Sequence, residues 1–364
     1  MRTRIHNLKR YLAYLPALLS VILFVSCETE IGYPVQGEPQ LVMNALLDPA
    51  KEENFVYLDI SNVHTVSYVE RAEVTLYING QKVETAEESS RVDTTGYNIP
   101  GLVTPKRYRL TSRFYPGDHI RIEAETADGK FHTEAETIVP QPIEDFEVDT
   151  LRAYIKDKYN QSGYYRKYNI TLKDRPGEDN YYRLDIVNDF TIECRNHIIE
   201  ESAWTLHYRY DNLINREDVI LTDGHPTTSD QGNETELFPV FENRYNIFSD
   251  ARFKDTEATL KVYTPLYEDM NSLFAGMMNY GDENLVSHTI CVRILCISEM
   301  EYKYLKALST FLSDEYDNTY MEPVYFPSNV KGGLGFVGAC SQTVKKIRLP
   351  DNIVYMRYVG NRQY

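Results

Sequence analysis

The sequence predicts a mainly β protein, with an N-terminal immunoglobulin-like β-sandwich followed by a larger β-rich domain that carries one packed helix. Short runs of alternating apolar and polar residues recur along the chain, with Gly, Pro, Asn and Asp clustered between them. One segment, near residues 299–315, instead repeats its apolar residues at helical spacing. The 30 tyrosines suit half-exposed strands, and they are a weaker sign of an aromatic platform for sugars or peptides.

Residues 1–26 have the parts of a lipoprotein signal peptide. Cationic residues precede an apolar run over residues 11–25, which is shorter than the roughly 20 residues that a membrane-spanning helix needs. The run ends in Phe24-Val25-Ser26-Cys27, and lipoprotein signals are cut before such a cysteine. We therefore expect Cys27 to carry the lipid. A secreted protein with a chance cysteine is the alternative.

Residues 27–39 predict a lipidated polar tether that opens with acidic residues. The segment Glu28-Thr29-Glu30 resembles the surface-export signal of Bacteroidota lipoproteins. The whole chain has a net charge of −16, and residues 1–26 contribute four positive and no negative charges, so the remainder carries −20. Such a charge argues against nucleic acid as a partner and against electrostatic membrane binding, which leaves anchoring in the outer membrane to the lipid.

The region 40–140 predicts the sandwich. Its expected strands cover residues 41–47, 55–60, 74–78, 108–110, 119–124 and 131–138. Asn79-Gly80 is a favoured two-residue hairpin turn. The spacing of strands and turns is that of an immunoglobulin-like sandwich, without the Cys and Trp hallmarks of antibody domains. Pro140 and Pro142 interrupt the pattern, and we place the domain boundary there.

The region 141–364 predicts a second β-rich domain. Its first expected strands cover residues 146–155, 164–172 and 181–194. Two Tyr-Tyr-Arg segments flank the turn Arg175-Pro176-Gly177, which predicts a hairpin between the second and third of these strands. Residues 222–239 form a long polar loop. Asp223, His225 and Asp230 on this loop match no recurring metal or acid–base site, so we interpret it as a solvated excursion.

The predicted helix begins with a capping box. Ser298 is the expected N-cap, and Glu301 is expected to reach back to it. The apolar stripe at helical spacing consists of Met300, Tyr304, Leu305, Leu308, Phe311 and Leu312. We expect this stripe to pack on a sheet.

Four cysteines remain once Cys27 is acylated. Cys291 and Cys296 lie five positions apart in one predicted strand, so they face opposite sides and cannot bridge each other. Disulfides to Cys194 and Cys340 are one reading. Buried free thiols are the other, because the strand is apolar on both faces.

The spacing of three glycines near the C-terminus matches the dinucleotide-binding fingerprint G-x-G-x-x-G. Gly333, Gly335 and Gly338 follow a Pro-rich loop, however, and lead into a strand-like run at residues 342–347. The fingerprint requires a strand before it and a helix after it, so we reject nucleotide binding. The glycines are expected to permit a bulge or a close approach to another backbone.

Several segments together carry a family resemblance. They are the signal with its acidic start and residues 41–45, 133–140, 297–302 and 322–336. They resemble the Bacteroidota lipoproteins of domain-of-unknown-function family 4249. The resemblance implies a cell-envelope lipoprotein, usually encoded near outer-membrane TonB-dependent receptors, with no established enzymatic activity and no catalytic residues to transfer. Cys291, Cys296 and Val337 depart from the family's usual apolar residues.

The sequence carries no catalytic signature. The seven histidines beyond residue 26 form no H-E-x-x-H pair, and no G-x-S-x-G elbow occurs. We therefore expect no enzyme, no metal and no cofactor apart from the lipid on Cys27. The expected function is a surface-exposed outer-membrane lipoprotein that serves as accessory or ligand-binding partner of a TonB-dependent transporter, with an unknown ligand. An adhesin or structural surface protein is the alternative. A carbohydrate- or peptide-hydrolysing enzyme is the third, since abundant carboxylates permit many pairs.

Overall fold

The computed structural model describes residues 38–61, 69–89, 106–156, 162–195, 202–209, 218–222, 243–266, 283–313, 316 and 322–355. The chain divides into two compact units after Glu38, and the described strands and helices belong to the second, Pro39–Tyr364. Most of them are strands, as the sequence predicts. In the described ranges, no helix has both the length and the apolar character needed to cross a membrane.

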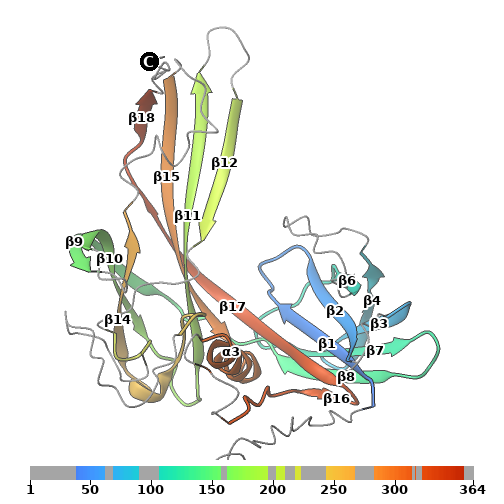
Figure 1. Ribbon diagram of the computed structural model, residues 1–364. Coiled ribbons are helices and arrows are strands. Elements are labelled where there is room, and N and C mark those ends of the chain that lie inside the picture. Colours follow the sequence, from blue (N-terminus) through green and yellow to red (C-terminus); the bar gives the residue numbers. More distant parts are fainter. Residues whose placement is uncertain are drawn as a thin grey trace, which may run out of the picture. The chain divides into compact units, whose positions relative to one another are not determined.

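The strands form three sheets (Figure 1). The large sheet has the order β12 (Ser202–Arg209), β11 (Tyr181–Arg195), β15 (Glu283–Ile297), β17 (Leu334–Arg348), β1 (Gln40–Leu47), β2 (Asn54–Ser61), β6 (Lys106–Leu110) and β5 (Glu87–Glu88), with β13 (Ile247–Ser249) beside β11 and β18 (Asn352–Tyr355) beside β15. The five-stranded sheet has the order β16 (Val330–Lys331), β8 (His132–Ile138), β7 (His119–Thr126), β3 (Ala72–Ile78) and β4 (Gln81–Thr85). The three-stranded sheet has the order β14 (Glu257–Pro265), β10 (Ser162–Lys173) and β9 (Phe146–Lys156). The helical elements are η1 (Asp250–Arg252) and α3 (Glu299–Phe311).

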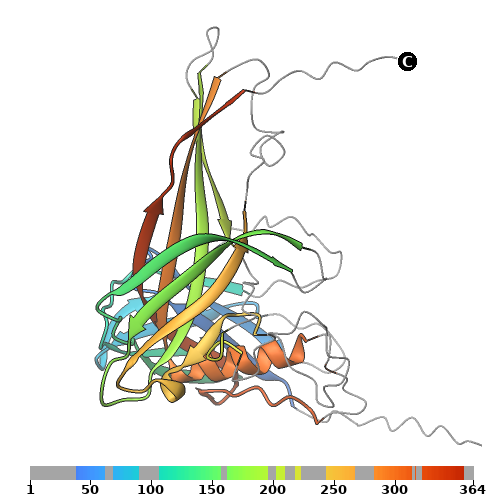
Figure 2. The same cartoon turned by 90° about the vertical axis from the view of Figure 1, so that its left-hand side faces the viewer.

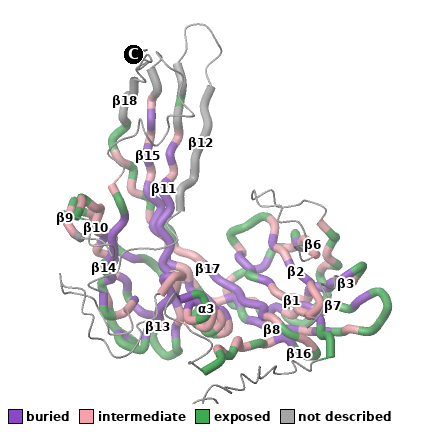
Figure 3. The backbone as a smooth tube through the Cα atoms, viewed as in Figure 1, coloured by how far each residue is buried: buried purple, intermediate pink, exposed green. Residues whose placement is uncertain are grey.

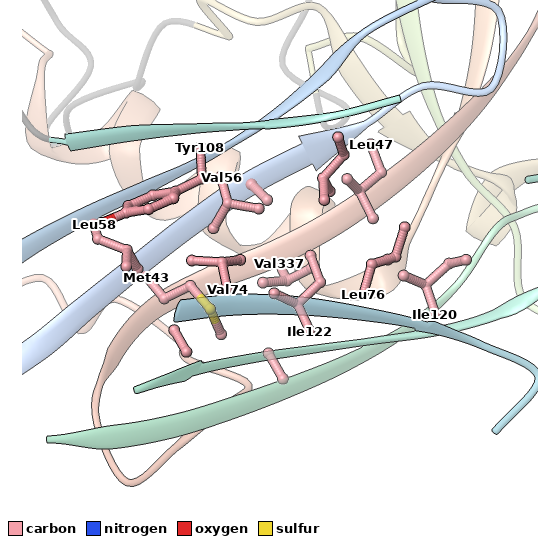
Figure 4. Close-up of a cluster of buried hydrophobic side chains, with 14 of the residues drawn as sticks. Met43, Leu47, Val56, Leu58, Val74, Leu76, Tyr108, Ile120, Ile122 and Val337 are labelled. Carbon is pink, nitrogen blue, oxygen red and sulfur yellow. The ribbon is translucent and has the colours of Figure 1, made fainter. Parts of the chain in front are cut away.

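The predicted sandwich is confirmed. Strands β1, β2, β6 and β17 of the large sheet face β3 and β7 of the five-stranded sheet, and their side chains interlock between the layers (Figure 4). In β1 every second residue is buried, from Leu41 to Leu47, because alternate side chains of a strand point to one face. The hairpin turn at Asn79-Gly80 is also confirmed, with both residues at positive φ as a type I′ turn requires.

The predicted hairpin between β10 and β11 is wrong. Strand β10 pairs with β9 and β14, whereas β11 pairs with β12, β13 and β15. The Pro176-Gly177 turn therefore carries the chain from one sheet to another. Tyr168 and Ile170 of β10 meet Leu184 and Ile186 of β11 in one core. The crossing buries the apolar faces of both strands against each other, which a hairpin within one sheet would not do.

Helix α3 packs on the sheets, as predicted, but its buried positions coincide with the predicted stripe only at Leu305. It contacts β17, β13 and β11 (Figure 2). Its buried residues are Glu301, Leu305 and Ser309, which recur every fourth position. Phe311 and Leu312, assigned to the core stripe by the sequence, are 50% and 41% exposed.

Strand β17 joins the cores of the protein. Its first half pairs in parallel with β1, and its second half pairs antiparallel with β15. Val337 and Ala339 enter the sandwich core, while Cys340 on the opposite face contacts the cluster under α3. Residues 336–341 of β17 form an unbroken buried run, which spans the change of partner from β1 to β15 (Figure 3). The division at residue 140 stays a prediction. Strand β17 from the C-terminal region contributes Val337 and Ala339 to the core of the N-terminal strands.

The close backbone approach predicted for the glycine segment is confirmed. A Cβ atom on Gly333 would lie 2.3 Å from the carbonyl oxygen of Leu41. A Cβ on Gly335, which has φ +101, would lie 2.3 Å from that of Met43. Both approaches to β1 are closer than real Cβ atoms tolerate, so only glycine permits β17 to pair at this distance. No helix follows these glycines, because β17 continues to Arg348.

Three of the four cysteines are buried free thiols, namely Cys291, Cys296 and Cys340. The two on β15 face opposite sides, as predicted. The Sγ of Cys291 donates to Asp189, whereas Cys296 lies in the core between the large and three-stranded sheets. The side chain of Cys194 lies outside those described.

We predict that Gly333→Ala destabilises the protein by about 2 kcal/mol or more, because the added methyl group collides with backbone and with the Cγ2 of Thr133, 2.5 Å away. Gly163→Ala is the matched control, since its Cβ would meet only the side chain of Tyr165 at an ordinary 3.4 Å. Urea unfolding midpoints measure the difference. Equal midpoints for the two variants would contradict the close-approach explanation.

Candidate functional site

The site residues predicted from the sequence lie outside the described residues. This holds for Cys27 with its acidic neighbours Glu28, Thr29 and Glu30, and for residues 223–239 of the polar loop. Their assignments stay predictions. The other segments that carry the family resemblance, residues 41–45, 133–140, 297–302 and 322–336, all lie within the described residues.

Four of those segments, distant in the sequence, meet at one place, which we call the motif junction. It comprises residues 41–45 of β1, 133–138 of β8, 297–302 at the start of α3, and 328–338 around β16 and β17. Val330 pairs with Ala135 across β16 and β8, and Met43 pairs with Gly335 across β1 and β17. The resemblance thus marks a single structural feature.

Two asparagine side chains hold the glycine segment in the junction. Asn329 donates to the carbonyl oxygens of Glu136 and Val337, both at 2.9 Å, and accepts from the Val337 N–H at 2.9 Å. Its amide acts as a strand partner for Val337, a position that β15 does not reach. Asn44 accepts from the N–H of Phe336 at 3.0 Å. These bonds satisfy backbone groups at the start of β17.

The first turn of α3 is attached to β17 by its cap. The hydroxyl of Ser298 accepts from the N–H of Glu301 at 3.3 Å, as the predicted capping box requires. The other half of the box is wrong. The N–H of Ser298 donates to the carbonyl of Ala339 at 2.9 Å, so it continues the pairing of β15 with β17. This frees the Glu301 carboxyl from the cap.

The Glu301 carboxyl is buried in the junction instead. Glu301 is 3% exposed, and the Oε2 atom of its carboxyl has no hydrogen-bond partner within the described part of the chain. It lies over Gly338, where a Cβ atom would come within 3.0 Å of Glu301 Cβ and 3.2 Å of Oε2. Gly338 therefore makes the space that this side chain occupies.

Burial dominates the electrostatics of Glu301. Its pKa is raised to about 8, chiefly by loss of hydration and also by the nearby Asp48. Arg183 and Lys51 oppose this rise. Burial also raises the pKa of the Cys340 thiol well above its ordinary value, with Glu301 adding to the shift. At neutral pH both groups are mainly uncharged.

An aromatic surface extends outward from the junction. We define it by Tyr304 and Phe311 of α3, Tyr316, and Tyr325, Phe326 and Phe336 of the following segment. Tyr304 stacks on Phe336 with ring centroids 3.9 Å apart, and Phe326 contacts the rings of Tyr304 and Phe311 at 5.6 and 5.7 Å. Tyr325 is 83% exposed. Aromatic side chains are enriched at binding surfaces, which makes this cluster a candidate one.

Other buried polar groups are engaged in holding turns. The hydroxyl of Tyr182 donates to Asp174 at 2.6 Å, and Asp250 accepts from the N–H of Asn180 at 2.8 Å. The pKa of Asp250 is raised, chiefly by burial. Asp218 accepts from the N–H groups of Leu221 and Lys261. These carboxylates accept bonds from the fold itself.

The buried histidine His288 lies on β15, opposite Phe190 of β11. It stacks on Phe190 with centroids 4.2 Å apart, and its Nε2 lies 2.7 Å from the Asn188 Oδ1. Burial, with the charge of Arg166, lowers its pKa to about 4, so the ring is neutral at physiological pH. No set of three or more His, Cys, Asp or Glu residues is arranged to hold a metal in the part of the chain that the structure describes.

The sequence predicts the motif junction only in part. The glycines were recognised, but Asn44 stands in an otherwise apolar run, and its polarity there is the signal that was missed. Glu301 was assigned to the cap, which concealed that it shares a helix face with Leu305 and Ser309. Which asparagine meets which backbone group depends on tertiary contacts that no local pattern reveals.

Comparison with known proteins gives one family match. Residues 28–346 match the model of a family described as "Domain of unknown function (DUF4249)". The matched range includes all four segments of the motif junction and the aromatic surface. No curated protein matches the chain.

We predict that Asn329→Ala destabilises the protein by about 2 kcal/mol, because it leaves the N–H and C=O of Val337 and the carbonyl of Glu136 without this partner. The neighbouring Ser328→Ala is the control, because it removes an exposed residue's hydroxyl that accepts one hydrogen bond, from the Val330 N–H at 3.2 Å. Denaturant unfolding with intrinsic fluorescence measures both. A smaller loss for Asn329→Ala than for Ser328→Ala would contradict the role of the amide.

Proposed function

Because the chain belongs to the DUF4249 family, we propose that it is a lipid-anchored outer-membrane protein that faces the cell surface and binds a TonB-dependent transporter. It would act without chemistry of its own, as an accessory or ligand-binding partner. The apolar run before Cys27 supports the anchor, and Glu28-Thr29-Glu30 supports the orientation, as in the Bacteroidota lipoproteins that the sequence resembles.

The observation that carries the binding role is the aromatic surface beside the motif junction. The segments shared with the family build a rigid joint from glycines and amides, and this joint fixes the rings of Tyr304 and Phe336. Phe311 and Tyr325 stay largely exposed on it. Rigid aromatic groups lose little conformational entropy on binding, so they are effective anchors in protein interfaces. We therefore assign the contact with the transporter to this surface.

The anchor can be tested directly. We expect protein expressed in cells fed a labelled fatty acid to take up the label and to fractionate with outer membranes. The lipid replaces electrostatic attachment, because the chain beyond residue 26 carries a net charge of −20. Cys27→Ala should lose both the label and the membrane fraction. Unlabelled wild-type protein, with Cys27→Ala fractionating identically, would overturn the anchor and the location that depends on it.

The contact surface has its own test. Detergent-solubilised outer membranes from cells with a tagged chain should yield a TonB-dependent transporter in a pull-down. Tyr325→Ala together with Phe311→Ala should reduce the recovered transporter by about tenfold or more, as loss of two aromatic anchors implies. Tyr115→Ala is the control, because Tyr115 is 64% exposed and does not belong to this surface. If the tagged protein is recovered under mild conditions as a monomer, without any transporter, the partnership is refuted.

A further inference from the structure

The buried carboxyl of Glu301 is placed where a change in its charge acts on several elements at once. It lies on the first turn of α3, above Gly338 of β17. A Cβ at Gly338 would also meet Leu46 of β1 at 3.3 Å, so β1 borders the same space. The Oε2 has no partner among the described residues. A buried polar atom without a partner is costly, and it is far more costly when charged.

Charged and titratable groups on several neighbouring elements interact electrostatically with this carboxyl. Asp48 and Lys51 follow β1, Arg183 lies on β11, and Cys340 lies on β17. On α3 itself, Glu299 and Lys303 pair with each other at 2.7 Å on the exposed side. Strand β13 offers only Ile247, Phe248 and Ser249. Within the described residues, neither nearby cation forms an ion pair or hydrogen bond with Glu301.

We infer that Glu301 is a proton-controlled latch between α3 and β17. As a neutral acid it keeps the first turn of α3 on β17, and as a carboxylate it releases that turn together with the rings that α3 carries. The consequence for partner binding rests on the proposed function of the aromatic surface. The latch itself is a property of the isolated chain and can be measured without any partner.

The direction of the pH effect follows from proton linkage. With α3 seated, the pKa of Glu301 is raised to about 8, whereas a released, hydrated carboxyl titrates near its ordinary 4.5. Between these values the seated form holds a proton that the released form lacks, so rising pH favours release. The released fraction should increase by about tenfold per pH unit through this interval and level off above pH 8.

Hydrogen exchange of the full chain in detergent, followed by mass spectrometry, tests the latch. After correction for intrinsic exchange, amides in residues 302–305 should lose protection about tenfold per pH unit between about pH 5 and about pH 8. Glu301→Gln keeps the shape of the neutral acid and should remove this dependence. Glu299→Gln is the matched control, because it removes an exposed carboxylate from the same turn and should preserve the dependence.

Either of two results would overturn the latch. One is that wild type and Glu301→Gln lose protection in parallel as pH rises. The other is that Glu299→Gln abolishes the dependence. If Glu301→Gln does not fold, infrared difference spectra of the wild-type chain decide the matter: the carbonyl band of a protonated carboxylic acid must disappear near pH 8, and its absence at pH 6 refutes the latch. A confirmed latch in a chain that recovers no transporter would refute only the proposed partnership.

Discussion

The parallel pairing of β1 with β17 is the constraint on which the rest of the described structure depends. It continues the large sheet from the sandwich side to β15 and β11, and it places two faces of one strand in two different cores. Glycine at 333 and 335 is required because the backbones meet at distances that leave no room for a Cβ atom. The amides of Asn44 and Asn329 accept from the N–H groups of Phe336 and Val337 and so complete the backbone hydrogen bonds beside these glycines.

Local patterns predicted most of the elements but few of their partners. Alternation located β1, β2 and β7, and Asn79-Gly80 located the β3–β4 turn, because each of these signals is contained in a few consecutive residues. The predicted hairpin between β10 and β11 was wrong, because strand pairing depends on residues that are far apart in the sequence. A turn says only that the chain changes direction, and burial of Ile170 against Ile186 decides whether the next strand lies beside or above the last. The stripe on α3 was correct for Leu305 but wrong for Phe311 and Leu312, since helical spacing alone does not identify the face that meets a sheet.

In the candidate site, too, local features were predicted from the sequence and tertiary contacts were not. The sequence singled out the glycines and the cap Ser298, and their structural roles were correctly anticipated in part. Glu301 illustrates what could not be anticipated. Its local setting fits a capping box equally well, and only the Ser298 N–H donating to Ala339 leaves the carboxyl to enter the junction. The buried, uncharged acid is therefore a consequence of how β15 and β17 pair.

The separation between the paired strands also governs the order of folding. Phe336 donates to Asn44 across 292 positions, and the sandwich core includes Val337 and Ala339. During synthesis the N-terminal strands must therefore wait for nearly the whole chain before their core can close. Contacts of such long range make folding slow, and they leave the unpaired edge of β1 exposed meanwhile. A chain of this topology acquires its native sandwich core late, once β17 has been synthesised.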